Sequence, residues 1–326
     1  MLDNNHRIIN YLRLSVTDRC NLRCIYCMPE KGVQFISHRE ILSYEEMLRI
    51  VRLCVYKGIR KVRVTGGEPL VRKEITNFLE MLCKIEGLEE ISLTTNGVLL
   101  KRFAADIKNC GISRINVSLD SLKPERFFRI TGRDYFERVW EGLEAAEHVE
   151  FNPIKINVVA IKGVNDDEIL DFANLAVNKP YHIRFIELMP VGGRETWDAA
   201  RFVSSDEIFR LIQTLGDLKP VKSNPYDGPA KRFKIIGGQG EIGLISALSH
   251  HFCEHCNRLR LTPEGHLRGC LFSEQEIDLK TPLRQKKQDD YLLQLIELAI
   301  KNKPKEHGIP KCFPRKCVPQ MNRIGG

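Results

Sequence analysis

Short apolar runs alternate with longer amphipathic stretches between Tyr11 and Leu188. The short runs are rich in valine, isoleucine and leucine, as buried strands are, and the longer stretches carry apolar residues at helical spacing. The pattern predicts strands at Tyr11–Ser15, Lys61–Thr65, Glu90–Thr94, Arg114–Ser118, Ile154–Ala160 and His182–Leu188. It predicts helices at 44–57, 75–84, 99–108, 124–130, 135–148 and 166–177.

This succession of strand–helix units predicts an α/β fold with a parallel sheet, because parallel neighbours need a crossover that a helix supplies. Barrels of this kind, closed or partly closed, place their chemistry in the loops that follow the strands. Polar, glycine-bearing or cysteine-bearing segments follow five of the predicted strands, at Thr17–Cys27, Thr65–Leu70, Thr94–Gly97, Ser118–Ser121 and Glu187–Pro190. We therefore expect one functional site at that end of the barrel.

The regular alternation weakens after residue 190. A helix is expected at Ser205–Leu215, and two short strands at Arg232–Ile236 and Glu241–Ala247 predict a hairpin. The turn-rich segment Asn224–Pro229, between this helix and the first of these strands, is a candidate domain boundary. We expect a barrel at 1–225 and a C-terminal region at 226–326.

The composition is that of a globular protein, with 326 residues, 43% hydrophobic and 28% charged. The net charge of +8 favours an anionic ligand, but the basic residues are spread along the chain and do not require nucleic acid, so we expect none as a partner. Residues 1–10 are polar and no run of eighteen apolar residues occurs, so neither a signal peptide nor a membrane span is predicted. We expect a cytoplasmic protein.

Eleven cysteines in such a chain indicate metal or redox chemistry rather than a disulfide framework. Cys20, Cys24 and Cys27 have C-x3-C-x2-C spacing directly after the first predicted strand. Three thiolates this close can hold three irons of a [4Fe–4S] cube and leave the fourth iron open. A structural zinc site is the alternative, but it usually has four protein ligands.

A second group, Cys253, Cys256 and Cys270, has C-x2-C-x13-C spacing and again lacks an obvious fourth cysteine. A histidine could complete a zinc site here, and the candidates are His250, His251, His255 and His266. Spacing alone leaves zinc and a second iron–sulfur cluster equally open.

The first cysteine group, with Tyr26 before its last cysteine, resembles the signature of radical S-adenosylmethionine (SAM) enzymes. In that superfamily the open iron binds SAM, and one-electron reduction cleaves SAM to methionine and a 5′-deoxyadenosyl radical. The loop Gly66-Gly67-Glu68-Pro69 is similar to the superfamily's GGEP motif, which receives the SAM amino group. Glycines permit close backbone approach, and carbonyl or carboxylate oxygens accept from an ammonium group. The resemblance implies SAM contacts at Tyr26, Gly67, Ser118 and Met189.

The second cysteine group, with Asn257-Arg258-Leu259-Arg260 inside it, resembles the GTP 3′,8-cyclase family of molybdenum cofactor biosynthesis. The opening segment Leu12–Cys20 and the final Gly325-Gly326 match the same family, so the resemblance covers nearly the whole chain. It implies a partial (β/α)6 TIM-like barrel of the radical SAM type with a C-terminal extension carrying a second [4Fe–4S] cluster. Cys253, Cys256 and Cys270 would hold that cluster, and its free iron would contact guanine.

Arginine and lysine suit a triphosphate, and a charge at an inward strand position is costly without an anion. By position, the resemblance implies GTP contacts at Arg13, Arg63, Thr94, Lys155, Arg258 and Arg260. It implies catalytic roles for Cys20, Cys24, Cys27, Arg258 and Arg260, and a double-glycine tail that reaches into the active site, where Arg323 could help it dock.

The implied activity is a lyase reaction from GTP to (8S)-3′,8-cyclo-7,8-dihydroguanosine 5′-triphosphate, begun by abstraction of the ribose 3′ hydrogen. The implied cofactors are two [4Fe–4S] clusters and SAM. The implied partners are a flavodoxin-like or chemical electron donor, a second copy of the chain in a homodimer, and cyclic pyranopterin monophosphate synthase downstream. Cys312 and Cys317 near the C-terminus depart from the family pattern, and no role is assigned to them.

Two other classes remain open on the sequence. A radical SAM enzyme acting on a peptide could carry an auxiliary-cluster domain, although such domains usually have more cysteines than this second group. A non-catalytic iron–sulfur or zinc protein, such as a redox sensor, would not need the GGEP loop, because it has no SAM to bind.

Overall fold

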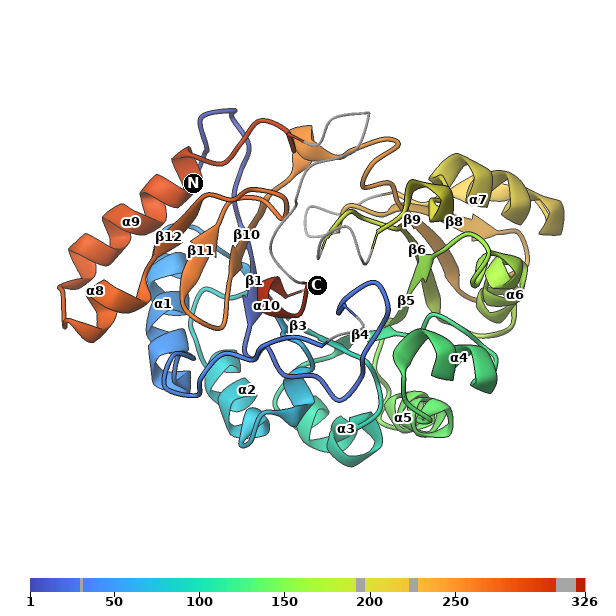
Figure 1. Ribbon diagram of the computed structural model, residues 1–326, viewed down its shortest axis with the longest axis horizontal. Coiled ribbons are helices and arrows are strands. Elements are labelled where there is room, and N and C mark those ends of the chain that lie inside the picture. The colour runs from blue at the N-terminus through green and yellow to red at the C-terminus, as the bar shows by residue number, and fades with distance from the viewer. Residues whose placement is uncertain (30–31, 192–196, 223–227, 309–320, 326) are drawn as a thin grey trace.

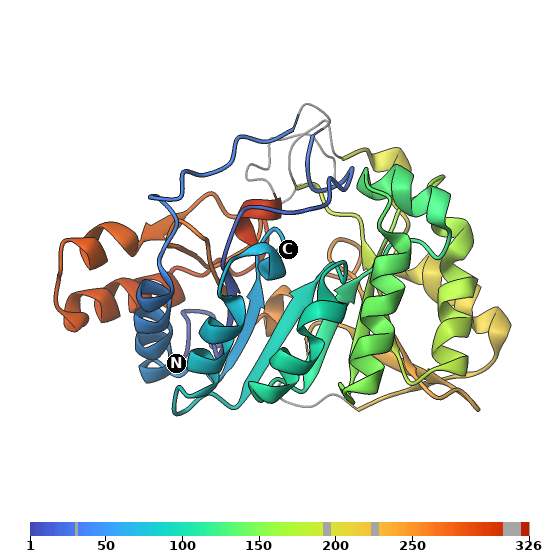
Figure 2. The same ribbon diagram turned by 90° about the horizontal axis from the view of Figure 1, so that it is seen from below.

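The computed structural model describes residues 1–29, 32–191, 197–222, 228–308 and 321–325. Its strands form one curved sheet, with most helices on the outer side and the short C-terminal helix at residues 321–324 on the inner side (Figures 1 and 2). The strand order is β12-β11-β10-β1-β2-β3-β4-β5-β6-β9-β8-β7. All neighbours from β10 through β9 are parallel, and the outer strands on both edges are antiparallel.

The strands of the barrel lie where the hydrophobic pattern places them. They are β1 (Tyr11–Ser15), β2 (Lys61–Thr65), β3 (Glu90–Thr95), β4 (Arg114–Ser118), β5 (Ile154–Ala160) and β6 (His182–Glu187). The helices are α1 (Tyr44–Tyr56), α2 (Ile75–Cys83), α3 (Leu100–Asn109), α4 (Pro124–Thr131), α5 (Phe136–His148), α6 (Ile169–Asn178) and α7 (Ser205–Ile212). The expected α/β barrel architecture is confirmed, with parallel strands in sequence order from β1 to β6.

Local chemistry explains why the elements begin where they do. Ser43 caps α1 in a reciprocal pair: its hydroxyl accepts from the Glu46 amide, and the Glu46 carboxylate accepts from the Ser43 amide at 2.7 Å. Along β1, Leu12 and Leu14 are fully buried in the core under the helices. Burying such side chains stabilises the fold by roughly 1.5–3 kcal/mol each. The alternate residues of the strands are then left to face the interior of the barrel.

The C-terminal part of the chain extends both edges of the same sheet. The expected hairpin forms from β8 (Lys231–Ile235) and β9 (Glu241–Ile245), and β9 pairs parallel to β6. At the other edge, β10 (Arg258–Leu261) pairs parallel to β1, and β11 (His266–Arg268) and β12 (Glu276–Asp278) follow it. Strand β7 (Leu218–Pro220) pairs with β8 across the segment 223–227, which lies outside the described residues and contains the expected boundary at residue 225.

The remaining helices were not expected from the sequence. They are α8 (Lys280–Arg284), α9 (Asp289–Lys301) and α10 (Met321–Ile324). Helix α9 lies beside α1 (Figure 1). Arg49 of α1 pairs with Asp289 at 2.6 Å, and Lys57, directly after α1, pairs with Glu297 at 2.8 Å. None of the helices in the described ranges combines the length and apolarity that a membrane span needs.

Candidate active site

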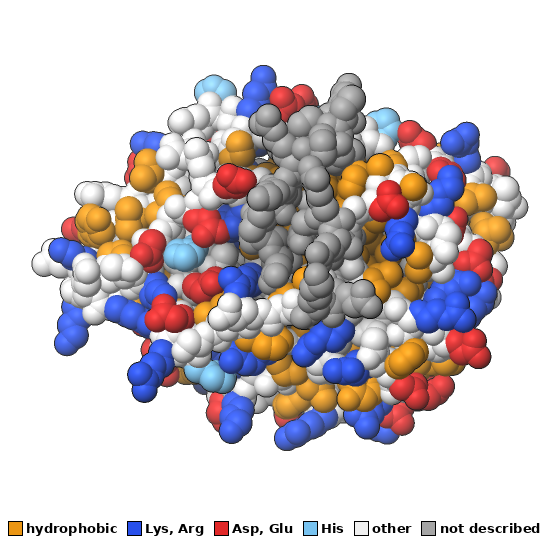
Figure 3. All heavy atoms as spheres, viewed as in Figure 1, with side chains coloured by type: hydrophobic (Ala, Val, Ile, Leu, Met, Phe, Trp, Pro, Cys, Tyr) orange, Lys and Arg blue, Asp and Glu red, His pale blue; other side chains and the backbone are white. Residues whose placement is uncertain are grey.

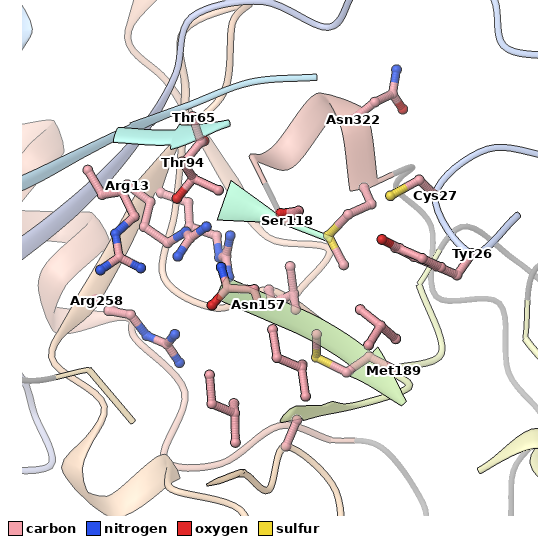
Figure 4. Close-up of a pocket in the computed structure, with 18 of the residues that line it drawn as sticks. Arg13, Tyr26, Cys27, Thr65, Thr94, Ser118, Asn157, Met189, Arg258 and Asn322 are labelled. Carbon is pink, nitrogen blue, oxygen red and sulfur yellow. The ribbon is translucent and has the colours of Figure 1, made fainter. Parts of the chain in front are cut away.

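One cavity at the end of the barrel is lined by residues from both ends of the chain. Both cysteine groups line it, together with inward residues of β1, β2, β3, β4, β5, β6, β9 and β10. Figure 4 shows Arg13 and Arg258 on one side and Tyr26 and Cys27 on the other, with Ser118 and Asn157 between them. The two cysteine groups that the sequence singles out therefore belong to a single site.

The cations of the cavity come from strand positions that the sheet register aligns. Arg13 lies opposite Arg63 on β2 and opposite Arg260 on β10, and Tyr11 lies opposite Arg258. On β6, Arg184 lies opposite Asn157 and also lines the cavity. On the face seen in Figure 3, by contrast, basic and acidic side chains are interspersed. The arginines of the cavity therefore form a cluster of positive charge that faces inward, unlike the mixed charges on the surface.

The electrostatics of this region fit a polyanionic ligand. Burial, together with Arg184, Arg63 and Lys61, lowers the pKa of Lys155 to about 6. Burial lowers the pKa of Arg13 to about 10. Burial alone would raise the pKa of Tyr11, but Arg63, Arg13 and Lys61 lower it to about 8. Like charges gathered in a buried space are costly, and a bound triphosphate would relieve that cost.

Five of the six expected GTP contacts line the cavity: Arg13, Arg63, Thr94, Arg258 and Arg260. Lys155 is 6% exposed and lies behind the lining, two residues before Asn157 on β5. The buried hydroxyl of Thr94 has no hydrogen-bond partner among the described residues. It is therefore available to a ligand.

The first cysteine group lies in the loop between β1 and α1. The amides of Arg23 and Ile25 donate to the carbonyls of Thr131 and Ile130, at 2.8 and 3.0 Å, and so fix the loop against α4. The hydroxyl of Tyr26 donates to the Asp120 carboxylate at 2.5 Å. Burial raises the pKa of the Cys20 thiol to about 11, so a metal must displace protons from this group.

The geometry of the first group favours a cluster over a single zinc ion. Two sulfur ligands on one tetrahedral zinc, each about 2.3 Å from it, lie roughly 3.8 Å apart. Among the described residues, the His, Cys, Asp and Glu ligand atoms that all lie within 4.8 Å of one another are those of His251, Cys253 and His307. The sulfurs of Cys20, Cys24 and Cys27 do not all lie within that distance of one another, as three ligands of one zinc ion would.

The expected SAM contacts Tyr26, Gly67, Ser118 and Met189 all line the cavity. A Cβ on Gly67 would lie 2.4 Å from the Arg19 carbonyl oxygen, so this glycine is required by the approach of the cysteine loop. The Glu68 carboxylate does not face the cavity. It is fully buried and accepts from the amides of Leu70 and Asn96 and the hydroxyl of Thr95, at 2.7–3.0 Å. The loop therefore offers backbone groups, and its carboxylate holds the loop in place.

The second cysteine group lies on the opposite wall. Cys253 is in a 3-10 turn, Cys253–His255, and Cys270 follows β11. Burial would raise the pKa of Cys256, but Arg258 and Lys303 lower it to about 6. This thiol is therefore predisposed to act as a thiolate ligand.

Of the four histidines considered as zinc ligands, His251 alone belongs to the compact group with Cys253; the group's other histidine is His307, which was not foreseen. His250 instead lies 2.8 Å from Asp206, and His266 lies 3.1 Å from Glu276.

The C-terminal tail enters the cavity, and Met321 and Asn322 of α10 line it. The side-chain amide of Asn322 donates to the Asp18 backbone carbonyl at 2.9 Å, and the Arg260 guanidinium donates to the Gly325 carbonyl at 2.5 Å. Arg323, for which a role in docking the tail is expected, donates from its guanidinium to the Gln34 carbonyl at 2.7 Å. Gly326, like Cys312 and Cys317, lies outside the described residues.

Sequence reasoning missed several polar residues of this region. Lys61 and Arg184 lie at inward positions of β2 and β6. Side chains two residues apart share a face of a strand, so Lys61 could have been inferred from Arg63, and Arg184 from the alternation along β6. Arg7 and Lys303 lie beside the second cysteine group, and no local pattern marks either of them.

Comparisons with known proteins define first the class and then the family. Residues 14–176 match the family model described as the Radical SAM superfamily, and residues 181–309 match Molybdenum Cofactor Synthesis C. A GTP 3′,8-cyclase of Desulforamulus reducens is 48% identical over 327 residues, which cover 100% of both chains. One of Heliobacterium modesticaldum is 48% identical over 311 residues, which cover 94% of each. The chain belongs to the GTP 3′,8-cyclase family.

Solved structures support the fold. Streptococcus suis SuiB bound to S-adenosylmethionine has a TM-score of 0.63 at 14% identity, covering 88% of this chain and 66% of that one. HydG, a maturase of the [FeFe]-hydrogenase, has a TM-score of 0.51 at 16% identity, covering 65% of this chain and 50% of that one. The chain thus spans about half to two thirds of these solved proteins, and at such identities the similarity shows the fold alone.

Proposed function

We propose that this protein is a radical SAM lyase that converts GTP to (8S)-3′,8-cyclo-7,8-dihydroguanosine 5′-triphosphate, the first step of molybdenum cofactor biosynthesis. The observation that carries the proposal is one cavity lined by two cysteine triads with buried arginines beside them. The full-length similarity to proteins named GTP 3′,8-cyclase supports the same reaction. A redox sensor has no need of a second triad next to a nucleotide-sized set of cations.

Two [4Fe–4S] clusters fit the donor sets of this cavity. Cys20, Cys24 and Cys27 would hold one of them, and Cys253, Cys256 and Cys270 the other. When bound, the first cluster and SAM supply the 5′-deoxyadenosyl radical that removes the 3′ hydrogen of the ribose. Tyr26, Gly67, Ser118 and Met189 would contact SAM from the loops that end β1, β2, β4 and β6.

The remaining residues bind and orient the substrate. Arg13, Arg63, Arg258 and Arg260 would bind GTP from β1, β2 and β10, with the Thr94 hydroxyl and the Lys155 ammonium beside them. Because these groups are fixed on paired strands, they hold the ribose and guanine in one orientation between the two triads. Helix α10 and Gly325 lie at the same site and help to exclude water from it.

The test is 5′-deoxyadenosine formation by anaerobically reconstituted, reduced protein with GTP, with ATP and without nucleotide. Stimulation by GTP alone, with the cyclic product, is the expected result. Formation that ignores GTP would refute the substrate and favour a peptide-modifying enzyme. Absence of SAM cleavage in protein that contains iron and sulfide would refute the radical reaction itself.

The partners are part of the proposal. The reaction needs a one-electron donor, for which a flavodoxin-like protein or a chemical reductant would serve, and the product would pass to cyclic pyranopterin monophosphate synthase. We also infer a homodimer, to be tested by sedimentation of the reconstituted protein. The nine cysteines among the described residues are all free thiols, which supports the reducing cytoplasm as the place of action.

A further inference from the structure

Lys303 is a buried lysine beside the second cysteine group. It follows α9 and is 3% exposed. Its ammonium donates to the Arg258 carbonyl at 2.9 Å and to the Gly269 carbonyl at 2.5 Å. Gly269 directly precedes Cys270, and Arg258 follows Cys256 by two residues. One ammonium group therefore joins the segments that carry two of the three cysteines.

Arg7 joins the third cysteine to the same stretch of chain. Its guanidinium donates to the Cys253 carbonyl at 2.8 Å, to the Pro304 carbonyl at 2.7 Å and to the Lys305 carbonyl at 3.0 Å. A buried ion pair of 2.6 Å with Asp3 orients the guanidinium. The backbone of Cys253 is thus held against residues 303–305, so all three cysteine segments converge on this short stretch.

The charge of Lys303 has no acidic partner nearby. Among the described residues, no carboxylate lies within ion-pair distance of its ammonium, and the two groups that accept from it are neutral carbonyls. A buried cation without an anion is costly, and the two carbonyls that hold this one belong to the segments that carry Cys256 and Cys270.

We infer that Lys303, held in place with Arg7, is a positioning residue that locks the second cysteine triad together and raises the reduction potential of the iron–sulfur cluster bound there. The inference rests on the proposed function, which assigns a cluster to this triad. The couple takes up one electron and no proton, and a fixed positive charge stabilises the reduced, more negative state. Neutralising the charge should lower the potential without changing the sulfur ligands.

The test uses full-length protein in which Cys20, Cys24 and Cys27 are alanine, so that only the second cluster gives a signal. In this background, Lys303→Met removes the charge at nearly constant volume and Lys303→Arg keeps it. Lys301→Met is the matched control, because Lys301 ends α9 and its half-exposed side chain pairs with Glu297. The readouts are iron per chain and the midpoint potential from a redox titration followed by electron paramagnetic resonance.

We expect Lys303→Met to reduce the reduced-to-oxidised ratio at a fixed potential at least tenfold, a shift of about 59 mV for a one-electron couple. Lys303→Arg and Lys301→Met should stay near the parent value. If Lys303→Met instead loses the cluster while Lys303→Arg retains it and both fold equally by circular dichroism, the locking role is supported. Equal potentials and equal iron in Lys303→Met and the parent overturn the inference. A parent protein with zinc and no iron at this triad would instead refute the proposed function.

The locking role has its own test in Arg7. Arg7→Met, in the same background, should release the Cys253 segment and increase the rate of iron loss to a chelator severalfold. Unchanged iron loss in Arg7→Met would remove Arg7 from the inference.

Discussion

Replacing Gly325 by alanine tests whether the docked tail is part of the working enzyme. Gly325 has a φ of +69°, which an L-residue adopts only at a cost. A Cβ there would lie 2.3 Å from the Thr65 hydroxyl oxygen and 3.2 Å from the Ser15 Cβ. The left-handed conformation alone costs roughly 1–2 kcal/mol, and the contact with Thr65 adds to it.

A total of about 2 kcal/mol lowers the equilibrium constant for docking of the tail about 30-fold, so a tail that is half docked would become about 3% docked, a decrease of roughly 15-fold. The Arg260 and Arg13 guanidinium groups would then lose the Gly325 carbonyl that they contact at 2.5 and 3.4 Å. We expect the cyclisation rate to fall by about the same factor. The iron content and the melting temperature should not change, because the tail lies outside the main hydrophobic core cluster.

The assay is product formation at saturating GTP and SAM, with iron counted in each preparation. Gly163→Ala is the matched control, since Gly163 has a φ of +70° but open space around its Cβ position. Thr65→Ala removes the closest clashing atom, so the double variant should recover part of the lost rate relative to Thr65→Ala alone. Full activity of Gly325→Ala would refute the view that this conformation of the tail is the active one.

Three further predictions concern the cations and the GGEP loop. Arg258→Ala or Arg260→Ala should raise the GTP concentration needed for half-maximal cyclisation at least tenfold while both clusters stay intact, and unchanged turnover at low GTP would contradict the assignment. Since the pKa of Lys155 is about 6 without ligand, GTP binding above that pH should take up a proton. The affinity should therefore weaken from pH 6 to pH 8, and Lys155→Met should flatten the profile in calorimetry. Glu68→Gln should lower the free energy of unfolding by about 1–3 kcal/mol, because a glutamine amide has one acceptor oxygen where the carboxylate has two, which leaves a buried donor unsatisfied; an unchanged denaturant midpoint would refute this role.

Lys155 also affects how the stability of the protein depends on pH. In the unfolded chain Lys155 keeps its proton up to its ordinary pKa of 10.5, whereas in the ligand-free fold it loses the proton above about pH 6. Between these values the unfolded state binds more protons, so this group makes the protein more stable as the pH rises. Saturating GTP should weaken that dependence, because the triphosphate favours the charged form.

The hydrophobic pattern predicted the barrel well because its strands are buried on both faces. In β1 and β2 every residue is buried, and the segments that follow these strands are polar or glycine-bearing, which marks where each strand ends. The same pattern also indicated which arginines face inward, because Arg13 and Arg63 alternate with core residues. The roles within the site depended on motif resemblance, since spacing alone could not distinguish an iron–sulfur cluster from zinc at the second triad.

Strand β10 shows what the sequence could not reveal. Its four residues, Arg-Leu-Arg-Leu, alternate as a half-buried strand does, but so short a run gives no periodicity to detect. The decisive fact is its pairing with β1, with Arg260 opposite Arg13 across 247 residues of chain. Such a contact is set by the whole fold and not by the local sequence.

That pairing explains why the site takes residues from both ends of the chain. With β10 on β1 and β9 on β6, the C-terminal part adds a parallel strand at each edge of the barrel and brings the second cysteine triad across the cavity from the first. The arginines of β10 thereby face those of β1 and β2, which creates a field that only an anion can satisfy. Lys303 and Arg7 then fix this wall through backbone carbonyls, a form of support that leaves no side-chain motif for sequence reasoning to find.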